Sequence, residues 1–369
     1  MKKIKIIFLV QNMEGGGAER VILNILNHID YNKFKITLLL LENRGSYLPQ
    51  IKKNKNLEIK HFKEIVKNRY ILFMINFFKS INYIRKNDTD IIFCQYNPGK
   101  ILPFFKFLLK NKKLIYRETN IPLFNVSEGF ILYRMYYNLF YNIGIDKYDT
   151  IITQSDDMKK GLSSIARNID KNKVVLINNP IDYEKIQSYI KHKSVNIFGD
   201  DKDTIKLISV GRLSFQKGYD LLIKTIAKLH NKNIKLIILG TGEEENILKN
   251  IIREYSLEEQ VRLLGFVENP YQYIVQADYF ISSSRYEGFS NAVLESCACG
   301  VPVIANNYLG GINEIIKTNL NGEIIDIEDI EQFRKAISRK YNSKYIKEDI
   351  RQRFSVEEII AKYERIFEE

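Results

Sequence analysis

Hydrophobic and polar positions follow one repeated pattern along this chain, in which a short apolar, β-branched run precedes a longer amphipathic stretch. This alternation is typical of parallel α/β units, whose buried strands are separated by helices. In the first half of the chain it predicts strands at 3–10, 34–41, 57–62, 90–95, 113–117, 150–153 and 173–177. Amphipathic stretches at 18–29 and 70–85 are the clearest helices between them.

A second series of the same kind follows, with strands predicted at 205–210, 235–239, 261–264, 278–283, 301–305 and 323–326. Asn-Asn-Pro at 178–180 and a polar stretch at 188–203 separate the two series and suggest a linker. We therefore expect an α/β protein with two Rossmann-like, doubly wound domains, at 1–195 and 196–350. Ser355 and Glu358 form a capping box for a last helix within 351–369, which can pack back on the first domain.

Composition agrees with two soluble domains, because 369 residues exceed one ordinary domain and 45% are hydrophobic against 27% charged. No apolar run reaches the length of a membrane span. The start MKKIKIIFLV leads into Gln-Asn-Met-Glu-Gly and not into a small-residue cleavage site, so it is interpreted as a strand. A cytoplasmic protein is expected. Cys297 and Cys299 are too few for a zinc site and are interpreted as small buried helix residues.

Charge is unevenly distributed between the two halves. Residues 1–195 carry 33 Lys+Arg against 17 Asp+Glu, whereas the whole chain has a net charge of +12, so the second half is acidic. The first half is therefore suited to meet an anionic partner. A nucleic-acid-binding protein is the alternative that this charge raises. It is disfavoured, because the glycine-rich, charged loops lie mostly in the acidic half and no nucleic-acid module is recognisable.

The most specific motif lies where the predicted strand at 278–283 gives way to a helix ending at Gly300. Two carboxylates, Glu287 and Glu295, bracket this strand-to-helix turn. A helix start offers backbone N–H groups to an anion, and neighbouring carboxylates accept hydrogen bonds from hydroxyl groups. A nucleotide sugar carries both kinds of group.

Other strand ends carry related chemistry. Arg212 and Lys217 lie in a Gly-bounded loop and can converge on a diphosphate, although a solvated loop is the alternative. Three glycines at 15–17 precede a helix, where a flexible turn without a ligand is nearly as plausible a reading. Phe266 can stack on a base or pack in the core. Glu118 can act as a catalytic or acceptor-orienting carboxylate or pair with a base such as Arg117.

Together these motifs resemble the retaining glycosyltransferases of family 4, which have the two-domain GT-B fold. The resemblance is carried by G-G-G-A-E-R at 15–20, S-V-G-R-L-S-F-Q-K-G at 209–218, G-T-G-E at 240–243, and E-G-F-S-N-A-V-L-E with A-C-G-V-P-V at 287–303. The resemblance implies a UDP-sugar donor, retention of anomeric configuration, and no metal or other cofactor. It also implies a ligand cleft between the two domains, at the carboxyl ends of their strands.

Residue roles follow from the same resemblance. Arg212 and Lys217 would hold the donor diphosphate, Glu287 the sugar hydroxyls, and Glu295 the ribose. The remaining donor-binding positions it implies are Gly16, Gly17, Gly211, Gly242, Phe266, Gly288, Phe289, Ser290 and Asn291.

One departure concerns the first domain. Many family members use a histidine in a loop facing the donor, but His28, His61, His192 and His230 all lie outside the motifs. Glu118 is therefore the substitute we predict for a catalytic role, with Asn120 and Ser155 on the acceptor side; capping of a helix is the alternative for Ser155. The stretch R-E-T-N-I-P at 117–122 resembles a variant found in amino-sugar transferases of bacterial surface glycans, which favours UDP-GlcNAc or UDP-GalNAc.

The acceptor is left open by the sequence. A lipid-linked or saccharide acceptor is expected, with a glucosyl or galactosyl transferase acting on a soluble or lipid A core acceptor as the alternative. A phosphorylase or a UDP-sugar epimerase of the same fold is a further alternative. Aromatic and basic residues mix at 71–79, 103–110 and 130–143, which favours peripheral binding to the anionic cytoplasmic face of the inner membrane over ordinary core helices. The oligomeric state is not predicted.

Overall fold

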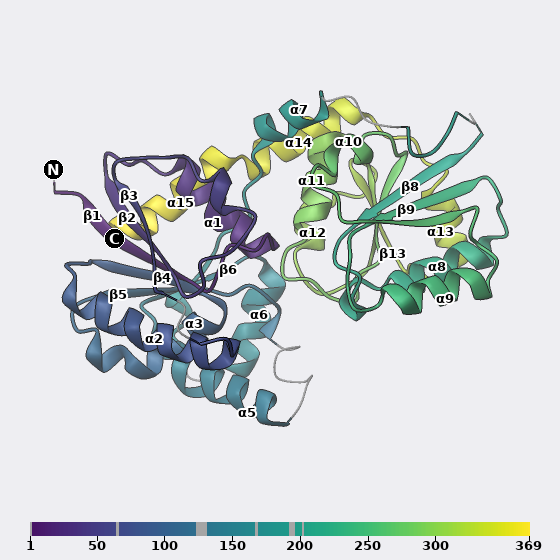
Figure 1. Ribbon diagram of the computed structural model, residues 1–369. Helices are drawn as coiled ribbons and strands as arrows, with labels where there is room; N and C mark the ends of the chain where they lie inside the picture. The colour runs from purple at the N-terminus through teal and green to yellow at the C-terminus, as the bar shows by residue number, and fades with distance from the viewer. Residues whose placement is uncertain (1, 64–65, 123–130, 167–168, 192–195, 201–202) are drawn as a thin grey trace. The chain divides into compact units, whose positions relative to one another are not determined.

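The computed structural model describes residues 2–63, 66–122, 131–166, 169–191, 196–200 and 203–369, with the backbone alone at 131–133. The chain divides into two compact units (Figure 1). Unit 1 comprises Met1–Pro180 together with Val356–Glu369, and unit 2 comprises Ile181–Ser355.

Unit 1 is built on a seven-stranded sheet in the order β3-β2-β1-β4-β5-β6-β7, and every strand pair in it is parallel. Its strands are β1 (Ile4–Val10), β2 (Phe34–Leu40), β3 (Leu57–His61), β4 (Ile91–Gln95), β5 (Lys113–Arg117), β6 (Thr150–Thr153) and β7 (Val174–Leu176). Its helices are α1 (Gly17–His28), α2 (Arg69–Lys86), α3 (Tyr96–Ile101), α5 (Ile131–Leu139), α6 (Asp156–Ile165) and α15 (Val356–Glu368), with short turns η1 (Leu48–Gln50), η2 (Leu102–Leu108), η3 (Phe140–Gly144), η4 (Ile145–Lys147) and η5 (Lys171–Lys173).

Unit 2 has a six-stranded parallel sheet in the order β10-β9-β8-β11-β12-β13. Its strands are β8 (Ile205–Val210), β9 (Ile234–Leu239), β10 (Val261–Gly265), β11 (Tyr279–Ser282), β12 (Val303–Asn306) and β13 (Gly322–Ile325). Its helices are α7 (Tyr183–Ile190), α8 (Tyr219–Leu229), α9 (Glu245–Glu254), α10 (Tyr271–Ile274), α11 (Asn291–Cys299), α12 (Ile312–Ile315), α13 (Ile330–Ala336) and α14 (Ser343–Phe354), with the turn η6 (Phe215–Lys217).

Both sheets are covered by helices on both faces, as β1 illustrates. Ile6 and Phe8 are buried in one cluster with residues of α1 and α15, whereas Ile7 and Leu9 are buried in another with residues of α2 and its neighbours. Figure 1 shows these helices on the two faces of the sheet. Strands buried on both faces are apolar throughout, which explains the continuous apolar runs in the sequence. The predicted doubly wound α/β fold is confirmed, with strand ends displaced by one or two residues.

The division between the units differs from the predicted boundary at 195/196, because α7 already packs on α10 and α11 of unit 2. Residues 196–200, predicted to belong to a polar linker, lie against the same unit. Ile197 and Phe198 are buried in its core, and Lys235 donates a hydrogen bond to the carbonyl of Phe198. An apolar pair within a polar stretch is enough to anchor this segment.

The chain returns to unit 1 at its end. Helix α14 completes unit 2, and α15 then lies beside α1 in unit 1. The ring of Phe367 on α15 meets Phe8, Phe34 and Phe93 edge-on, with centroids 6.0–6.1 Å apart. The last helix is therefore part of the unit 1 core.

Candidate functional site

Three loops of unit 2 leave the carboxyl edge of its sheet and are joined by backbone hydrogen bonds. Leu213 N, in the loop after β8, donates to Thr241 O after β9, and Glu244 N donates back to Leu213 O, both at 3.0 Å. Arg285 N, in the loop after β11, donates to Gln216 O at 2.8 Å. Because parallel strands end at one edge, residues far apart in sequence meet there.

Glycines allow this close approach. Gly218 adopts a left-handed conformation with φ +62°, and a Cβ there would collide with the carbonyl of Ser283. Gly240, with φ +140°, lies equally close to the carbonyl of Gly211. A side chain at either position would separate the loops, so both glycines are needed for their geometry.

Lys217 and Glu287 meet at the centre of these loops. Lys217 Nζ lies 2.5 Å from Glu287 Oε1, and the Ser284 hydroxyl donates to the same oxygen at 2.9 Å. Gln216 Nε2 lies 3.5 Å from Glu287 Oε2. Burial, the largest single effect, acts to lower the pKa of Lys217, but the charge of Glu287, its hydrogen bond and the nearby Tyr219 together outweigh burial, so the pKa is raised. The pair is therefore a charged, largely buried ion pair.

The start of helix α11 lies beside this pair. Ser290 is its N-cap residue, but the Ser290 side chain makes no capping hydrogen bond. A small cavity is lined by Lys217 and Ser290, and by Ser209, Val210, Tyr219, Phe280, Ile281, Ser282, Ser283, Ser284 and Ala292. Serine hydroxyls, a lysine and a helix start together suit an anion that carries several oxygen atoms.

The other predicted donor residues fall into two groups. Arg212 is exposed, and Phe266 is 75% exposed, so both side chains are accessible to a ligand. Phe289 and Glu295 are buried. The ring of Phe289 packs on Phe354 with centroids 5.8 Å apart, so only its backbone is placed to serve a ligand.

The glycines at Gly211, Gly242 and Gly288 act through the backbone. Gly211 N donates to Leu239 O at 3.0 Å, and Gly288 O accepts from Gly311 N at 3.2 Å. Gly242 lies against the backbone of Leu213, where a Cβ would collide. These positions keep the loops around the ion pair together. Asn291 begins α11 directly after the N-cap.

In unit 1, Gly16 and Gly17 are exposed at the start of α1, which also begins at the carboxyl edge of a parallel sheet. Their loop is braced by the segment after β2, where Met13 N donates to Arg44 O at 3.0 Å. Burial raises the pKa of the Glu19 carboxyl in the first turn. The Oε2 atom of Glu19 is buried and has no hydrogen-bond partner among the described residues.

Glu118 is fully buried, and its carboxylate is surrounded by donors. Tyr141 Oη donates to Oε2 at 2.7 Å, and Thr119 N donates to Oε1 at 2.9 Å. Arg117 does not use Glu118 as its hydrogen-bond partner, because its guanidinium bonds Gln95, Asn179 and Tyr363 instead. The Glu118 carboxylate therefore fixes the turn that follows β5.

The two predicted acceptor-side residues also make local hydrogen bonds. Asn120 Oδ1 accepts from Ile121 N at 2.9 Å. Ser155 is buried and caps α6 by accepting from Met158 N at 3.2 Å, as in the alternative interpretation of this residue. Ser284 and Gln216 are partners of Glu287 that were not predicted from the sequence. The run of three serines at 282–284, where the predicted strand at 278–283 ends, was the available signal.

Other features limit the chemistry of the described residues. They contain no group of three or more His, Cys, Asp or Glu side chains placed to hold a metal ion. Cys297 and Cys299 are buried free thiols whose pKa values burial raises. In the described part of the chain, no helix is both long and apolar enough to cross a membrane.

Two family models match the chain, one to each half. The model described as Glycosyltransferase Family 4 matches residues 15–185, and the model for glycosyl transferases group 1 matches residues 190–355.

Curated relatives agree with this match. An uncharacterized glycosyltransferase of Methanocaldococcus jannaschii is 30% identical over 296 residues, which cover 76% of this chain and 71% of the relative. The N-acetylgalactosamine-N,N'-diacetylbacillosaminyl-diphospho-undecaprenol 4-alpha-N-acetylgalactosaminyltransferase of Campylobacter jejuni is 29% identical over 344 residues, which cover 89% of this chain and 87% of the enzyme.

Solved structures show the same fold. HepE of Anabaena, solved in complex with UDP, superposes with a TM-score of 0.75 at 19% identity, covering 99% of this chain and all of HepE. The sucrose-phosphate synthase of Thermosynechococcus elongatus superposes with a TM-score of 0.79 at 15% identity, covering 99% of this chain and 98% of the synthase.

Proposed function

The chain belongs to the family 4 glycosyltransferases of GT-B fold, and on that basis we propose that it transfers a sugar from a UDP-sugar to a hydroxyl group with retention of anomeric configuration. One observation carries the proposal for the donor site. The Lys217–Glu287 ion pair, the exposed Arg212 and the start of α11 all lie at one edge of the unit 2 sheet.

Each of these groups binds a different part of the donor. Arg212 and Lys217 bind the diphosphate, and backbone N–H groups at the start of α11 assist them. Glu287 accepts hydrogen bonds from the sugar hydroxyls, and Glu295 from the ribose. Phe266 provides an exposed aromatic face for the base.

The reaction breaks the bond between the anomeric carbon and the oxygen of UDP and joins that carbon to the acceptor oxygen. Negative charge develops on the departing UDP, where fixed cations stabilise it most in the transition state. The acceptor proton passes to a phosphate oxygen of UDP on the same face of the sugar. No protein base is required for this step, which fits a Glu118 carboxylate already engaged by Tyr141. No metal is assigned a role.

For the donor we propose UDP-GlcNAc or UDP-GalNAc, with UDP-glucose or UDP-galactose as the alternative. Two observations support the amino sugars: the R-E-T-N-I-P stretch at 117–122, and the Campylobacter relative, whose name states that it transfers N-acetylgalactosamine. That name also specifies a diphospho-undecaprenol acceptor. We propose a lipid-linked acceptor for this chain too, in the biosynthesis of a bacterial surface glycan.

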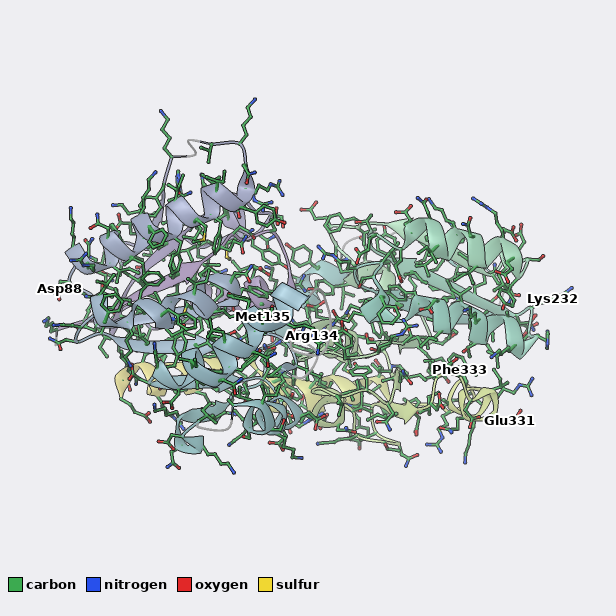
Figure 2. All side chains as sticks on the ribbon, turned by 90° about the horizontal axis from the view of Figure 1, so that it is seen from below. Asp88, Arg134, Met135, Lys232, Glu331 and Phe333 are labelled. Atoms are coloured by element: carbon green, nitrogen blue, oxygen red, sulfur yellow. The ribbon has the colours of Figure 1, made fainter. Side chains whose placement is uncertain are left out.

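A lipid-linked acceptor requires access to a membrane surface. Helix α2 exposes Ile71, Met74 and Phe78 in one stripe, and Phe78 packs on Phe105 of η2, with centroids 5.5 Å apart, beside the exposed Phe107. Arg69, the first residue of α2, and Lys110, two residues after η2, are both exposed. We propose that this face of α2 and η2 contacts the cytoplasmic leaflet of the inner membrane peripherally. Met135 on α5, labelled in Figure 2, is a further exposed apolar side chain at 62%.

Turnover of several UDP-sugars, measured with a lipid-linked oligosaccharide extract, tests the proposal. We expect UDP release to depend on the acceptor and to be fastest with UDP-GlcNAc or UDP-GalNAc. Release of free UDP from the UDP-sugar without any acceptor would favour an epimerase. Sugar phosphate formed with inorganic phosphate would favour a phosphorylase. Either result would overturn the transferase.

A further inference from the structure

Arg285 joins the two loops that supply Lys217 and Glu287, although it is not part of that ion pair. Its Nη1 and Nη2 atoms donate to the two carboxylate oxygens of Asp220 at 2.9 and 2.8 Å. Nη1 also donates to the carbonyl of Phe215 at 2.7 Å, and the guanidinium lies 4.0 Å from the centroid of the Phe215 ring. Arginine is suited to such a site, because its planar fork binds a carboxylate with two bonds while its face stacks on a ring.

These contacts surround Lys217 in the sequence. Phe215 precedes it by two residues and Asp220 follows it by three, so Arg285 holds the η6 turn from both sides. Hydrogen bonds from side chains to backbone carbonyls complete the attachment. Ser283 Oγ donates to Lys217 O at 2.9 Å, and Gln216 Nε2 donates to Tyr286 O at 2.9 Å. The turn carrying Lys217 is thereby fixed to the loop carrying Glu287.

The charges of Arg285 and Asp220 are satisfied by each other. Burial acts to raise the pKa of Asp220, but its hydrogen bonds and its charge contact with Arg285 lower the pKa overall. The hydrogen bond to Asp220 is the main cause that raises the pKa of Arg285. A guanidinium engaged by a carboxylate, a carbonyl and a ring is poorly placed to bind a phosphate as well. Its effect on a ligand must therefore pass through the loop it holds.

We propose that Asp220 and Arg285 form a brace that positions Lys217 for the diphosphate of the donor, which makes them positioning residues of the transfer reaction. This inference rests on the proposed function, because it takes the diphosphate as the ligand of Lys217. Binding to an ammonium group that is already fixed costs less protein entropy than binding that must first order the side chain and its loop. Loosening the brace should weaken UDP binding even though neither residue touches UDP.

The test compares Asp220→Asn and Arg285→Lys with Glu323→Gln, as a control for general loss of stability. Glu323 is a buried carboxylate of unit 2 that, like Asp220, is paired with an arginine; it accepts from Tyr341 Oη at 2.9 Å and pairs with Arg339. It lies near the start of β13, and hence toward the opposite edge of the sheet. UDP affinity is measured by calorimetry and thermal stability by calorimetric melting.

We expect UDP to bind about tenfold more weakly to Asp220→Asn and Arg285→Lys, corresponding to about 1.4 kcal/mol, with Glu323→Gln unchanged. The critical measurement is a double-mutant cycle. In a Lys217→Ala background, Asp220→Asn should cause little further loss, because the group it positions is gone. A purely structural role for Asp220 predicts the same loss in both backgrounds.

The brace would be overturned if Asp220→Asn bound UDP as tightly as Glu323→Gln did, or if its loss persisted undiminished in Lys217→Ala. These results are distinct from failure of the proposed function. If the proposed function were wrong, the unaltered protein would not bind UDP at all.

Discussion

Among single residues, Lys100 of α3 stands out because it is a buried cation in a cluster of tyrosines. Its Nζ donates to Tyr137 Oη at 2.9 Å and lies 4.1 Å from the centroid of the same ring. Burial lowers the pKa of Lys100 to about 8, and the nearby charge of Glu118 only partly opposes this. Because the unfolded chain restores an ordinary lysine pKa, this residue links stability to pH.

The sign of the effect follows from the two pKa values. Between pH 8 and about 10.5 the unfolded state binds more protons at Lys100 than the folded state does, so stability rises with pH in that window. We therefore compare the free energy of unfolding of the unaltered protein with that of Lys100→Met. The difference between them should shift in favour of the unaltered protein as the pH rises, by at most about 1.4 kcal/mol per pH unit. Urea unfolding of both proteins at pH 7, 8, 9 and 10 measures the difference. A difference that is constant over this range would contradict the lowered pKa.

At the residue scale, the sequence predicted which loops form the site but not which side chains contact one another. Lys217 and Glu287 were placed at two strand ends of the same sheet, but their pairing depends on how β8 and β11 are ordered. The environment of Glu118 was not foreseeable, because its donor Tyr141 comes from η3, 23 residues further along the chain. The burial of Phe289 likewise depends on Phe354 of a distant helix.

Among the elements, α15 shows how the last residues of the chain complete a core formed by the first. Its apolar stripe, Ile359, Tyr363 and Phe367, is buried in unit 1. The sequence predicted the helix from its capping box, Ser355 and Glu358. The predicted boundary at 350/351 falls inside the preceding helix, α14, which belongs to unit 2. Only one residue, Ser355, separates α14 from α15.

Removing the Phe367 ring should therefore destabilise unit 1 in particular. We expect Phe367→Ala to cost about 3–5 kcal/mol, because the ring is buried and makes four aromatic contacts that water cannot replace. Hydrogen exchange should accelerate in β1, β2 and β4 but not in β8 or β11. Ile247→Ala, at an exposed position on α9, provides the control and should change neither unit. Equal acceleration in both units would contradict the assignment of α15.

At the scale of the whole molecule, the net positive charge of residues 1–195 and the exposed apolar stripe on α2 together suit binding to an anionic membrane surface. We expect the protein to sediment with vesicles containing anionic lipid at low salt. Ile71→Asp with Met74→Asp should weaken this binding about tenfold or more, since two apolar side chains no longer enter the interface. The matched variant Ile247→Asp with Tyr255→Asp alters two exposed apolar residues at α9 and should bind normally. Normal sedimentation of the α2 variant, or no binding of the unaltered protein, would exclude this face as the docking surface.

The central claim is that the loops of unit 2 bind the diphosphate of a UDP-sugar, and calorimetric titration of UDP tests it most directly. Arg212 is exposed, so Arg212→Ala should leave the fold intact while removing one of the two diphosphate cations. We expect the unaltered protein to bind one UDP, and Arg212→Ala to bind it at least tenfold more weakly, the loss of one charge-assisted contact. Lys232→Ala, at an exposed position of the same unit, should bind UDP normally (Figure 2). Equal affinity of the Arg212 and Lys232 variants, or no binding by the unaltered protein, would contradict the assignment.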